Sequence, residues 1–534
     1  MATLDINALL DPRLWPSTRL VLHVAFFLAV FFLLKQLFDL LDLARLKHLA
    51  RPKGSYRIPM ILLTLLFGAL LIHQATWQLA GIYRPQFIGF MQLHDRREFN
   101  PAHWIQRGRL LDHRGEVLAY SEESQGRVYR RYPDGPVFAP VVGYTQPRFG
   151  ATGMEAVATA HLNGGEPASL NDWGELGRQL VTRDKRPRGK DLVLTLDADL
   201  QRLAVERLAG QRGAVVILSP TDGAVRVLAS VPSYDPNRIG AELFLDAEAG
   251  TSLLNRATQG LYPPGSVFKI AVAALALERG FSGTLDCPAD GFTTSERYRK
   301  IRDHEYYEAR RSGTSWRGHG RIGLAQAMAR SSNVFFAQLG VQQGRDAFQT
   351  LADQIHLNRR ISLHESPYGR FGLITGELPS LAKTDRHGLA QISIGQGRVL
   401  VTPAYMAMLV AAVGNQGVAM RPRLIAREPA EPFARFMSAS TASQLAPMLR
   451  LVVTEGTARG IDTPRLRIAG KTGTAENAQG DAHSWFVGYA PADRPTLAVA
   501  VLVEHGGYGS LVAAPIARDL LLRAQETGLI HRDP

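Results

Sequence analysis

A run of residues without Asp, Glu, Lys or Arg extends from Ile58 to Tyr83, and it constrains where the rest of the chain can fold. It is long enough to cross a lipid hydrocarbon core, which requires roughly 20 residues. Apolar residues occupy every face of the run, whereas a helix on the surface of a soluble domain keeps a polar face. We therefore predict a transmembrane helix at about residues 58–82.

A second apolar segment, Leu20 to Leu34, lies upstream of this run. It is short for a span, and two arrangements are open. It can cross the membrane within a helix at about residues 17–38 if Arg19 and Lys35 extend to the interface, or it can lie along the interface. We expect a membrane anchor over residues 1–83 with two transmembrane helices.

The loop between the two apolar segments is basic, which predicts the topology of the chain. It holds Lys35, Arg45, Lys47, Arg51, Lys53 and Arg57 against only Asp39 and Asp42. By the positive-inside rule this loop is cytoplasmic, so everything after Tyr83 lies outside the cytoplasm. The predicted location is the cell membrane, or the inner membrane where a cell has two, with the main part of the chain outside the cytoplasm.

Composition limits the remaining choices. The chain has 534 residues, 46% hydrophobic and 20% charged, which is typical of a folded protein with two or three domains. Its one cysteine, Cys287, excludes an internal disulfide framework and a multi-cysteine metal site, and we expect neither metal nor cofactor. The net charge of +13 suits an anionic neighbour such as a membrane lipid surface, wall polymer or nucleic acid. Most of this charge is scattered as single arginines, which favours a solvated surface instead. The extracytoplasmic location argues against a nucleic-acid partner.

The chain after the anchor divides near residue 190. Residues 84–190 show glycine- and proline-containing turns and little helical periodicity, which predicts a small, mostly β, extended domain and a linker. Residues 191–534 predict an α+β domain whose antiparallel sheet comes from its start and its end, with helices between. The expected strands are 192–196, 214–218, 224–228, 466–474, 484–489 and 496–503, and the expected helices are 197–208, 266–279, 322–342, 345–355, 402–414 and 513–527.

The turn Pro263-Pro264-Gly265 leads into the apolar segment that begins with Ser266 and ends at Gly280. Ser266 therefore lies near a helix N-terminus, where free N–H groups and the helix dipole favour developing negative charge. Lys269 follows one turn later on the same face. A hydroxyl beside an amine is a nucleophile with a base in reach. The pattern alone is weak, because Ser380-x-x-Lys383 repeats it in a polar stretch without a helix.

Two further motifs distinguish the first copy from chance. Ser331-Ser332-Asn333 precedes an apolar run, and Lys471-Thr472-Gly473-Thr474 lies on a predicted strand. With Ser266-x-x-Lys269 in front of them, in this order, they resemble the active-site triplet of penicillin-binding proteins and serine β-lactamases.

The residue types suggest a division of chemical roles. Ser266 attacks an acyl carbonyl, and Lys269 takes its proton if burial and nearby positive charge lower the pKa of the amine. Lys471 supplies part of that charge and attracts a substrate carboxylate. Ser331 can pass a proton towards a leaving amine, because a hydroxyl both donates and accepts.

The other motif residues suit substrate binding. The amide of Asn333 can hold peptide bonds, and Thr474 can bind a terminal carboxylate. The backbone N–H groups of Ser266 and Thr474 can form an oxyanion hole. Thr472 and Gly473 also have a structural interpretation, since glycine lets a substrate backbone approach the strand edge.

The chain resembles a class B penicillin-binding protein, a monofunctional peptidoglycan D,D-transpeptidase. The resemblance implies the penicillin-binding transpeptidase fold, an antiparallel sheet flanked by helices, behind a β-rich pedestal domain at residues 84–190. It covers about residues 107–520 and includes 107–112, 150–155, 228–237, 394–397 with 402–403, and 483–491. His113-Arg114 departs from the Arg-Asn that is frequent in the family, and one transmembrane helix is commoner than two.

The resemblance also implies substrates and a partner. The donor would be a stem peptide ending in D-alanyl-D-alanine, Ser266 would form the acyl-enzyme with loss of D-alanine, and an amine on a neighbouring strand would complete the cross-link. Penicillin and other β-lactams would acylate the same serine. A polytopic glycosyltransferase of the shape, elongation, division and sporulation family would supply the glycan strands.

Two other functions share parts of this pattern. The first is hydrolysis, by a D,D-carboxypeptidase or a serine β-lactamase. Class A β-lactamases use a glutamate-bound water, and neither Glu365 nor Glu377 has a context that suggests this role. The second is a β-lactam sensor without enzymatic activity. Sensors of that kind carry a metalloprotease domain, and the chain contains no His-Glu-x-x-His.

Three conspicuous residues lie outside the motifs. We interpret His483 and Trp485 as packing residues of the strand after the third motif, since Trp-Phe-Val is a typical buried strand composition. Cys287 is interpreted as a buried thiol without a chemical role.

Overall fold

The computed structural model describes residues 105–124, 127–164, 188–245, 251–477 and 480–530, together with 31, 63 and 65–73. The chain forms two units, Met1–Phe90 and Met91–Pro534. Residues 65–73 of the first unit are helical. Within the described residues, no helix combines the length and the apolar character that a membrane span requires. The predicted spans at 17–38 and 58–82 fall largely outside the described residues.

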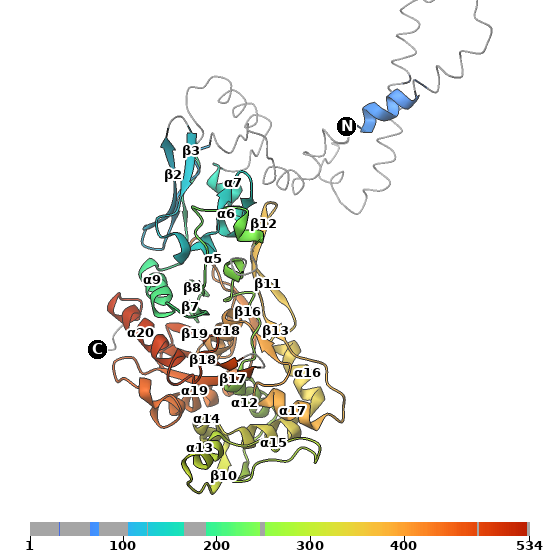
Figure 1. The fold of residues 1–534 in the computed structure, drawn as a ribbon, viewed down its shortest axis with the longest axis vertical. Coiled ribbons are helices and arrows are strands. Elements are labelled where there is room, and N and C mark those ends of the chain that lie inside the picture. The colour runs from blue at the N-terminus through green and yellow to red at the C-terminus, as the bar shows by residue number, and fades with distance from the viewer. Residues whose placement is uncertain are drawn as a thin grey trace, which may run out of the picture. The chain divides into compact units, whose positions relative to one another are not determined.

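A five-stranded antiparallel sheet forms the centre of the second unit (Figure 1). Its strand order joins the two ends of the domain, because the late strand β19 pairs with the early strand β7, as the sequence predicts. From one edge to the other the strands are β17 (Ala469–Asn477), β18 (Gly480–Ala490), β19 (Leu497–Val503), β7 (Gly213–Leu218) and β8 (Val225–Val231). The third motif therefore lies on the edge strand β17.

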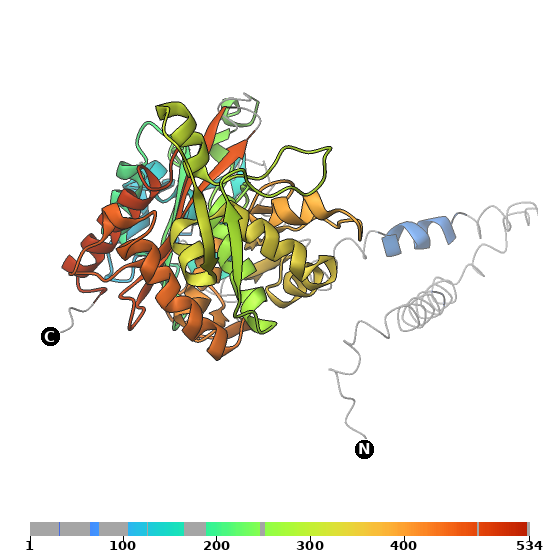
Figure 2. The same cartoon turned by 90° about the horizontal axis from the view of Figure 1, so that it is seen from below.

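Helices cover both faces of this sheet, as Figures 1 and 2 show from two directions. Every residue of β19 is buried, and a strand of that kind needs cover on both sides. α20 (Ala513–Glu526) packs on β18, β19 and α9 (Ala198–Arg207), while α18 (Pro403–Gly414) packs on β7, β18 and β19. α19 (Ala439–Thr454) packs on β17.

The helices between the two halves of the sheet carry the first two motifs. They are α12 (Lys269–Glu278), α13 (His304–Ser312), α14 (Leu324–Arg330), α15 (Asn333–Gln343), α16 (Arg345–Gln354) and α17 (Arg386–Ser393). The prediction of one helix over residues 322–342 is wrong, because the chain forms two helices there. Ser331 adopts a left-handed conformation with φ 59° and ends α14, and the side chain of Ser332 accepts from the N–H of Phe335 to begin α15.

Short strand pairs surround this core. They are β9 (Thr284–Pro288) with β10 (Gly318–Gly323), β11 (Arg360–Ser366) with β12 (Gly369–Ile374), β13 (Gly376–Glu377) with β14 (Leu400–Val401), and β15 (Val418–Met420) with β16 (Pro432–Arg435). A short helix, α10 (Glu242–Leu245), follows β8.

The described part of the predicted pedestal contains helices as well as strands. β1 (Leu110–Leu111), β2 (Val117–Ser124) and β3 (Arg127–Arg131) form a sheet with β6 (Leu192–Val193), and β4 (Thr145–Gln146) pairs with β5 (Gly150–Ala151). Between them lie α5 (Ala139–Val142), α6 (Gly153–Val157) and α7 (Thr159–Leu162). The prediction of a mostly β domain did not include these helices. They are four or five residues long, which is too short to produce a helical period in the sequence.

Candidate active site

The turn that carries Ser266 is a short 3-10 helix, Gly265–Phe268, that runs into α12. Gly265 has φ +54°, and a side chain there would meet the carbonyl oxygen of Thr474 at 2.7 Å. The N–H of Gly265 donates to the carbonyl of Gly395 at 2.8 Å. Ser266 is partly exposed at the start of this helical segment. The turn is therefore fixed against β17 while the hydroxyl of Ser266 stays accessible.

Lys269 is fully buried and lies where three oxygen atoms meet. Its ammonium group donates to the backbone carbonyl of Ser331 at 2.6 Å, to the Asn333 Oδ1 at 2.8 Å and to the Ser331 Oγ at 3.3 Å. The break between α14 and α15 makes this possible, since the left-handed turn at Ser331 directs both its carbonyl and its hydroxyl towards α12. The first two motifs thus meet at one amine.

The third motif completes the group from the edge strand β17. The Nζ of Lys471 donates to the Ser331 Oγ at 2.9 Å and to the carbonyl of Thr472 at 3.0 Å. The hydroxyl of Thr472 lies 2.6 Å from that of Thr457. The hydroxyl of the partly exposed Thr474 accepts from the N–H of Gly509 at 3.4 Å.

The two buried lysines determine the electrostatics of the site. Burial lowers the pKa of Lys269 to about 7, although the carboxylates of Asp303 and Glu305 act in the opposite direction. Burial, with the charge of Lys269, holds the pKa of Lys471 well below its usual value. An amine with a pKa near 7 is partly neutral at neutral pH and can accept a proton from a hydroxyl. Because both amines lie close to the Ser331 hydroxyl, their positive charges repel each other, and protonation of one disfavours protonation of the other.

Trp485 supports the turn of Ser266 as well as the strand. Its indole Nε1 donates to the carbonyl of Pro263 at 3.0 Å, and its side chain is fully buried. A side chain at Gly473 would lie 3.0 Å from both the carbonyl oxygen of Pro264 and the Cβ of Trp485. The predicted packing role of Trp485 fits this geometry, but the prediction did not include the hydrogen bond from Trp485 to Pro263. His483 accepts at Nδ1 from the N–H of His505 at 3.1 Å.

Sequence reasoning missed Asp303, which is buried beside the second motif. Its carboxylate accepts from the backbone N–H of Asn333 at 2.6 Å. An aspartate in a stretch of charged residues gives no signal of its own, because only the tertiary fold brings residue 303 next to residue 333.

The second serine–lysine pattern lacks the buried setting of the first, whereas Cys287 lies beside the second motif, with its Sγ 3.8 Å from the Oγ of Ser332. Ser380 and Lys383 are exposed and precede α17 in a segment without helix. Cys287 is a buried free thiol on β9, and burial raises its pKa to about 11. Glu365 is exposed on β11 and pairs with Arg370.

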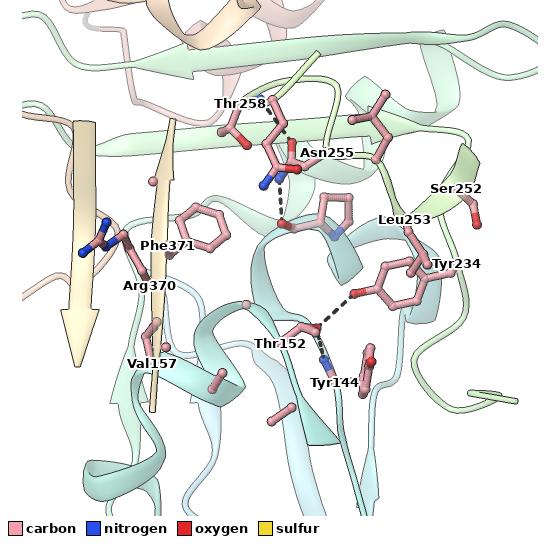
Figure 3. Close-up of a pocket in the computed structure, with 18 of the residues that line it drawn as sticks. Tyr144, Thr152, Val157, Tyr234, Ser252, Leu253, Asn255, Thr258, Arg370 and Phe371 are labelled. Atoms are coloured by element: carbon pink, nitrogen blue, oxygen red, sulfur yellow. Dashed lines mark hydrogen bonds between the residues drawn. The ribbon is translucent and has the colours of Figure 1, made fainter. Parts of the chain in front are cut away.

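A separate cavity of about 450 Å³ lies where α5 and α6 meet the segment around Asn255 and β12 (Figure 3). Asn255 Nδ2 donates to the carbonyl of Pro140 at 2.8 Å, and the hydroxyls of Tyr234 and Thr152 lie 3.5 Å apart. Among the described residues that line this cavity, none belongs to the three motifs. It is a feature of the junction between the first part of the unit and the sheet domain.

Comparison with known proteins identifies the family. Residues 213–522 match the penicillin binding protein transpeptidase domain, and residues 107–187 match the penicillin binding protein A dimerisation domain. The peptidoglycan D,D-transpeptidase PbpA of Mycolicibacterium smegmatis is 31% identical over 79% of this chain and 90% of its own length. The chain belongs to the class B penicillin-binding proteins.

Solved structures agree with this assignment. Penicillin-binding protein A from M. tuberculosis, solved as a ceftriaxone acyl-enzyme complex, has a TM-score of 0.69 and 28% identity over 79% of this chain and 99% of that one. PBP2 of Pseudomonas aeruginosa has a TM-score of 0.65 and 28% identity over 78% of this chain and 95% of that one. The three motifs of this class B penicillin-binding protein therefore lie in a fold whose relatives form acyl-enzymes with β-lactams.

Proposed function

We propose that the chain is a membrane-anchored peptidoglycan D,D-transpeptidase that cross-links stem peptides through an acyl-enzyme on Ser266. The observation that carries the proposal is that the three motifs meet at Ser331. Its Oγ accepts hydrogen bonds from the Nζ of Lys269 at 3.3 Å and from the Nζ of Lys471 at 2.9 Å. Serine hydrolases and acyltransferases need a nucleophile, a base and a proton relay within reach of one another, and this group supplies the base and the relay.

In the acylation step, the Ser266 hydroxyl attacks the carbonyl of the penultimate D-alanine while neutral Lys269 takes its proton. The backbone N–H groups of Ser266 and Thr474 stabilise the oxyanion. Ser331 passes a proton to the leaving nitrogen and takes one from protonated Lys269, which lies 3.3 Å from its hydroxyl. The carbon–nitrogen bond breaks, and D-alanine departs. A serine ester of the stem peptide remains.

In the second step, an amine of a neighbouring stem peptide attacks this ester. Neutral Lys269 takes a proton from the attacking amine as the new amide bond forms. The bond to the Ser266 oxygen breaks, and Lys269 returns the proton to that oxygen. Asn333 holds the donor peptide, Lys471 and Thr474 bind the terminal carboxylate, and Thr472 and Gly473 keep the strand edge open to the substrate backbone. A β-lactam follows the first step only, because its ring carbonyl is attacked in the same way and its leaving nitrogen stays attached.

The organisation of the whole chain is part of the proposal. Residues 1–83 anchor the chain with two transmembrane helices at about 17–38 and 58–82, residues 84–190 form the pedestal and linker, and residues 191–534 form the transpeptidase domain. The basic loop between the apolar segments supports a catalytic domain outside the cytoplasm. Alkaline phosphatase fused after residue 90 should be active and after residue 50 inactive; the reverse pattern would contradict this topology.

The glycan strands come from a second protein, a polytopic glycosyltransferase of the shape, elongation, division and sporulation family. The support for a separate polymerase is the short distance between the predicted anchor and the transpeptidase match at residue 213. Co-purification of such a polymerase from detergent-solubilised membranes tests this part, and a chain that forms glycan strands alone would contradict it.

The reaction is tested with the full chain in detergent micelles, a synthetic peptide ending in D-alanyl-D-alanine and an amine acceptor. Mass spectrometry should detect free D-alanine and the new amide in matching amounts. D-alanine without the amide would indicate a carboxypeptidase, and rapid turnover of penicillin a β-lactamase. Stable acylation by penicillin without any reaction of the peptide would indicate a sensor.

A further inference from the structure

Asp303 lies directly behind the second motif and is only 3% exposed. Its carboxylate accepts from the backbone N–H of Asn333 at 2.6 Å and of Val334 at 3.1 Å, and from the hydroxyl of Ser332 at 3.0 Å. These groups belong to the first turn of α15, where backbone N–H groups have no partner within the helix. One carboxylate therefore fixes the start of the helix that carries Asn333.

The neighbouring residue, Arg302, fixes the side chain of Asn333. The backbone carbonyl of Arg302 accepts from Asn333 Nδ2 at 3.2 Å. With its nitrogen held there, the amide turns its oxygen towards Lys269, and the two atoms lie 2.8 Å apart. Arg302 is itself held, since its Nε donates to the carbonyl of Asp290 at 3.2 Å and its guanidinium lies 4.3 Å from the ring centre of Tyr306.

We propose that Asp303 is a positioning residue for acylation. With the carbonyl of Arg302 it holds Asn333 against Lys269, it fixes Ser331 through the neighbouring Ser332, and it contributes negative charge to the buried site. The inference rests on the proposed function, in which Lys269 is the base. Asp303 does not touch the reacting atoms, because it acts through the backbone of α15 and through its charge.

The charges around these groups determine the expected pH behaviour. Lys269 faces Lys471 from β17 and the carboxylates of Asp303 and Glu305 from the segment that begins α13. Asp303 in turn faces His319 of β10, whose Nε2 lies 3.7 Å from Asp303 Oδ2 and 3.6 Å from Glu305 Oε1.

His319 is buried, and its Nε2 has no hydrogen-bond partner among the described residues. Its Nδ1 lies 3.3 Å from Arg330 Nη1.

Asp303→Asn separates the two contributions. The amide oxygen can still accept from the N–H groups of α15, but the negative charge is gone. The charge of Asp303 raises the pKa of Lys269, so its removal lowers that pKa. The amine of Lys269 then stays neutral to a lower pH. The acid limb of acylation by a fluorescent penicillin should move to lower pH in Asp303→Asn. In Asp303→Ala the N–H groups also lose their acceptor, and acylation should slow by about 10-fold or more at every pH.

Glu308→Gln is the matched control. Glu308 is an exposed carboxylate on α13 that pairs with His304, and removing its charge should leave the pH profile unchanged. If Asp303→Asn keeps the wild-type acid limb, or Asp303→Ala acylates at the wild-type rate, the positioning role is wrong. Should Asp303→Ala fail to fold, the profile of Asp303→Asn alone decides. A wild-type chain that penicillin does not acylate would instead overturn the proposed function, and this inference with it.

Discussion

Lys269 and Lys471 donate to the same hydroxyl group, that of Ser331, at 3.3 and 2.9 Å. Both amines are fully buried, and they reach Ser331 from α12 and from β17, which are about 200 residues apart in the chain. The hydroxyl between them can pass a proton from one amine to the other. The fold thus brings residues of three separate motifs together at one hydroxyl group.

Replacing Lys269 by Arg should nearly abolish acylation by penicillin. Arginine keeps a positive charge and several donors, but it cannot be deprotonated and so cannot act as the base. Loss of a general base typically slows a reaction by about 100- to 10,000-fold, and we expect an acylation rate reduced within that range. The rate is measured with a fluorescent penicillin. Lys383→Arg, in the exposed second copy of the pattern, should leave it unchanged; equal losses in the two variants would contradict the assignment.

The acylation rate of the wild-type chain should depend on pH through Lys269. Burial lowers the pKa of this amine to about 7, and only the neutral amine accepts a proton. The rate should therefore be highest above pH 7, fall to about half near pH 7, and decline about tenfold per unit at lower pH. Stopped-flow measurement over pH 5 to 9 gives this profile. A rate that still rises about tenfold per unit between pH 8 and pH 9 would contradict a base with a pKa of about 7.

Gly473→Ala tests the packing of the third motif on the serine turn. A Cβ at residue 473 would lie 3.0 Å from the carbonyl oxygen of Pro264, from Trp485 and from Val267, so the turn must shift. Overpacking of this kind costs about 1–3 kcal/mol, and acylation should slow because Ser266 moves with the turn. Gly460→Ala is the control, since nothing lies within 4 Å of a Cβ there. Wild-type acylation by Gly473→Ala would contradict this coupling.

Glu155→Gln tests what the buried ion pairs of α6 contribute to stability. Glu155 is fully buried, and it accepts from Arg107 at 3.1 Å and from Arg130 at 2.6 Å. The amide leaves two buried guanidinium groups without a countercharge, a change that costs about 3–5 kcal/mol. We expect a thermal midpoint lower by several degrees at pH 7. Glu122→Gln, at an exposed pair with Arg131, should change it little.

The difference in thermal midpoint between the wild type and Glu155→Gln should also depend on pH. Burial acts to raise the pKa of Glu155, but Arg130 and Arg107 outweigh burial and hold that pKa below its ordinary value of 4.5. A depressed carboxyl pKa stabilises the fold above pH 4.5, and this stabilisation is lost as the pH falls through the folded value. The thermal midpoints of wild type and Glu155→Gln should therefore converge in acid. A constant difference would contradict an electrostatic origin.

The sequence allowed a prediction of the site because Ser266, Lys269 and Lys471 occur in patterns with fixed spacing, and the fold brings Lys269 and Lys471 to one hydroxyl group, that of Ser331. Apolar runs also predicted β7 and β19, because strands buried on both faces contain unbroken apolar sequence. It failed at residues 322–342, where the apolar pattern continues across the break at Ser331. A left-handed serine is uncommon, and propensity did not indicate one.

The supporting residues were beyond the reach of local patterns. The hydrogen bond from Trp485 to Pro263 and the contact between Asp303 and Asn333 join segments that are distant in sequence. A tryptophan and an aspartate are common residues, and only the tertiary structure gives these two their roles. The resemblance could therefore suggest which side chains react, but not what holds them in place.

The central claim is that Ser266 is the nucleophile, and peptide mapping by mass spectrometry tests it directly. After incubation with penicillin, the full chain should carry one covalent adduct, on the peptide that contains Ser266. Ser380→Ala should keep the adduct, and Ser266→Ala should lose it. An adduct on a different residue, or one that persists in Ser266→Ala, would contradict the account.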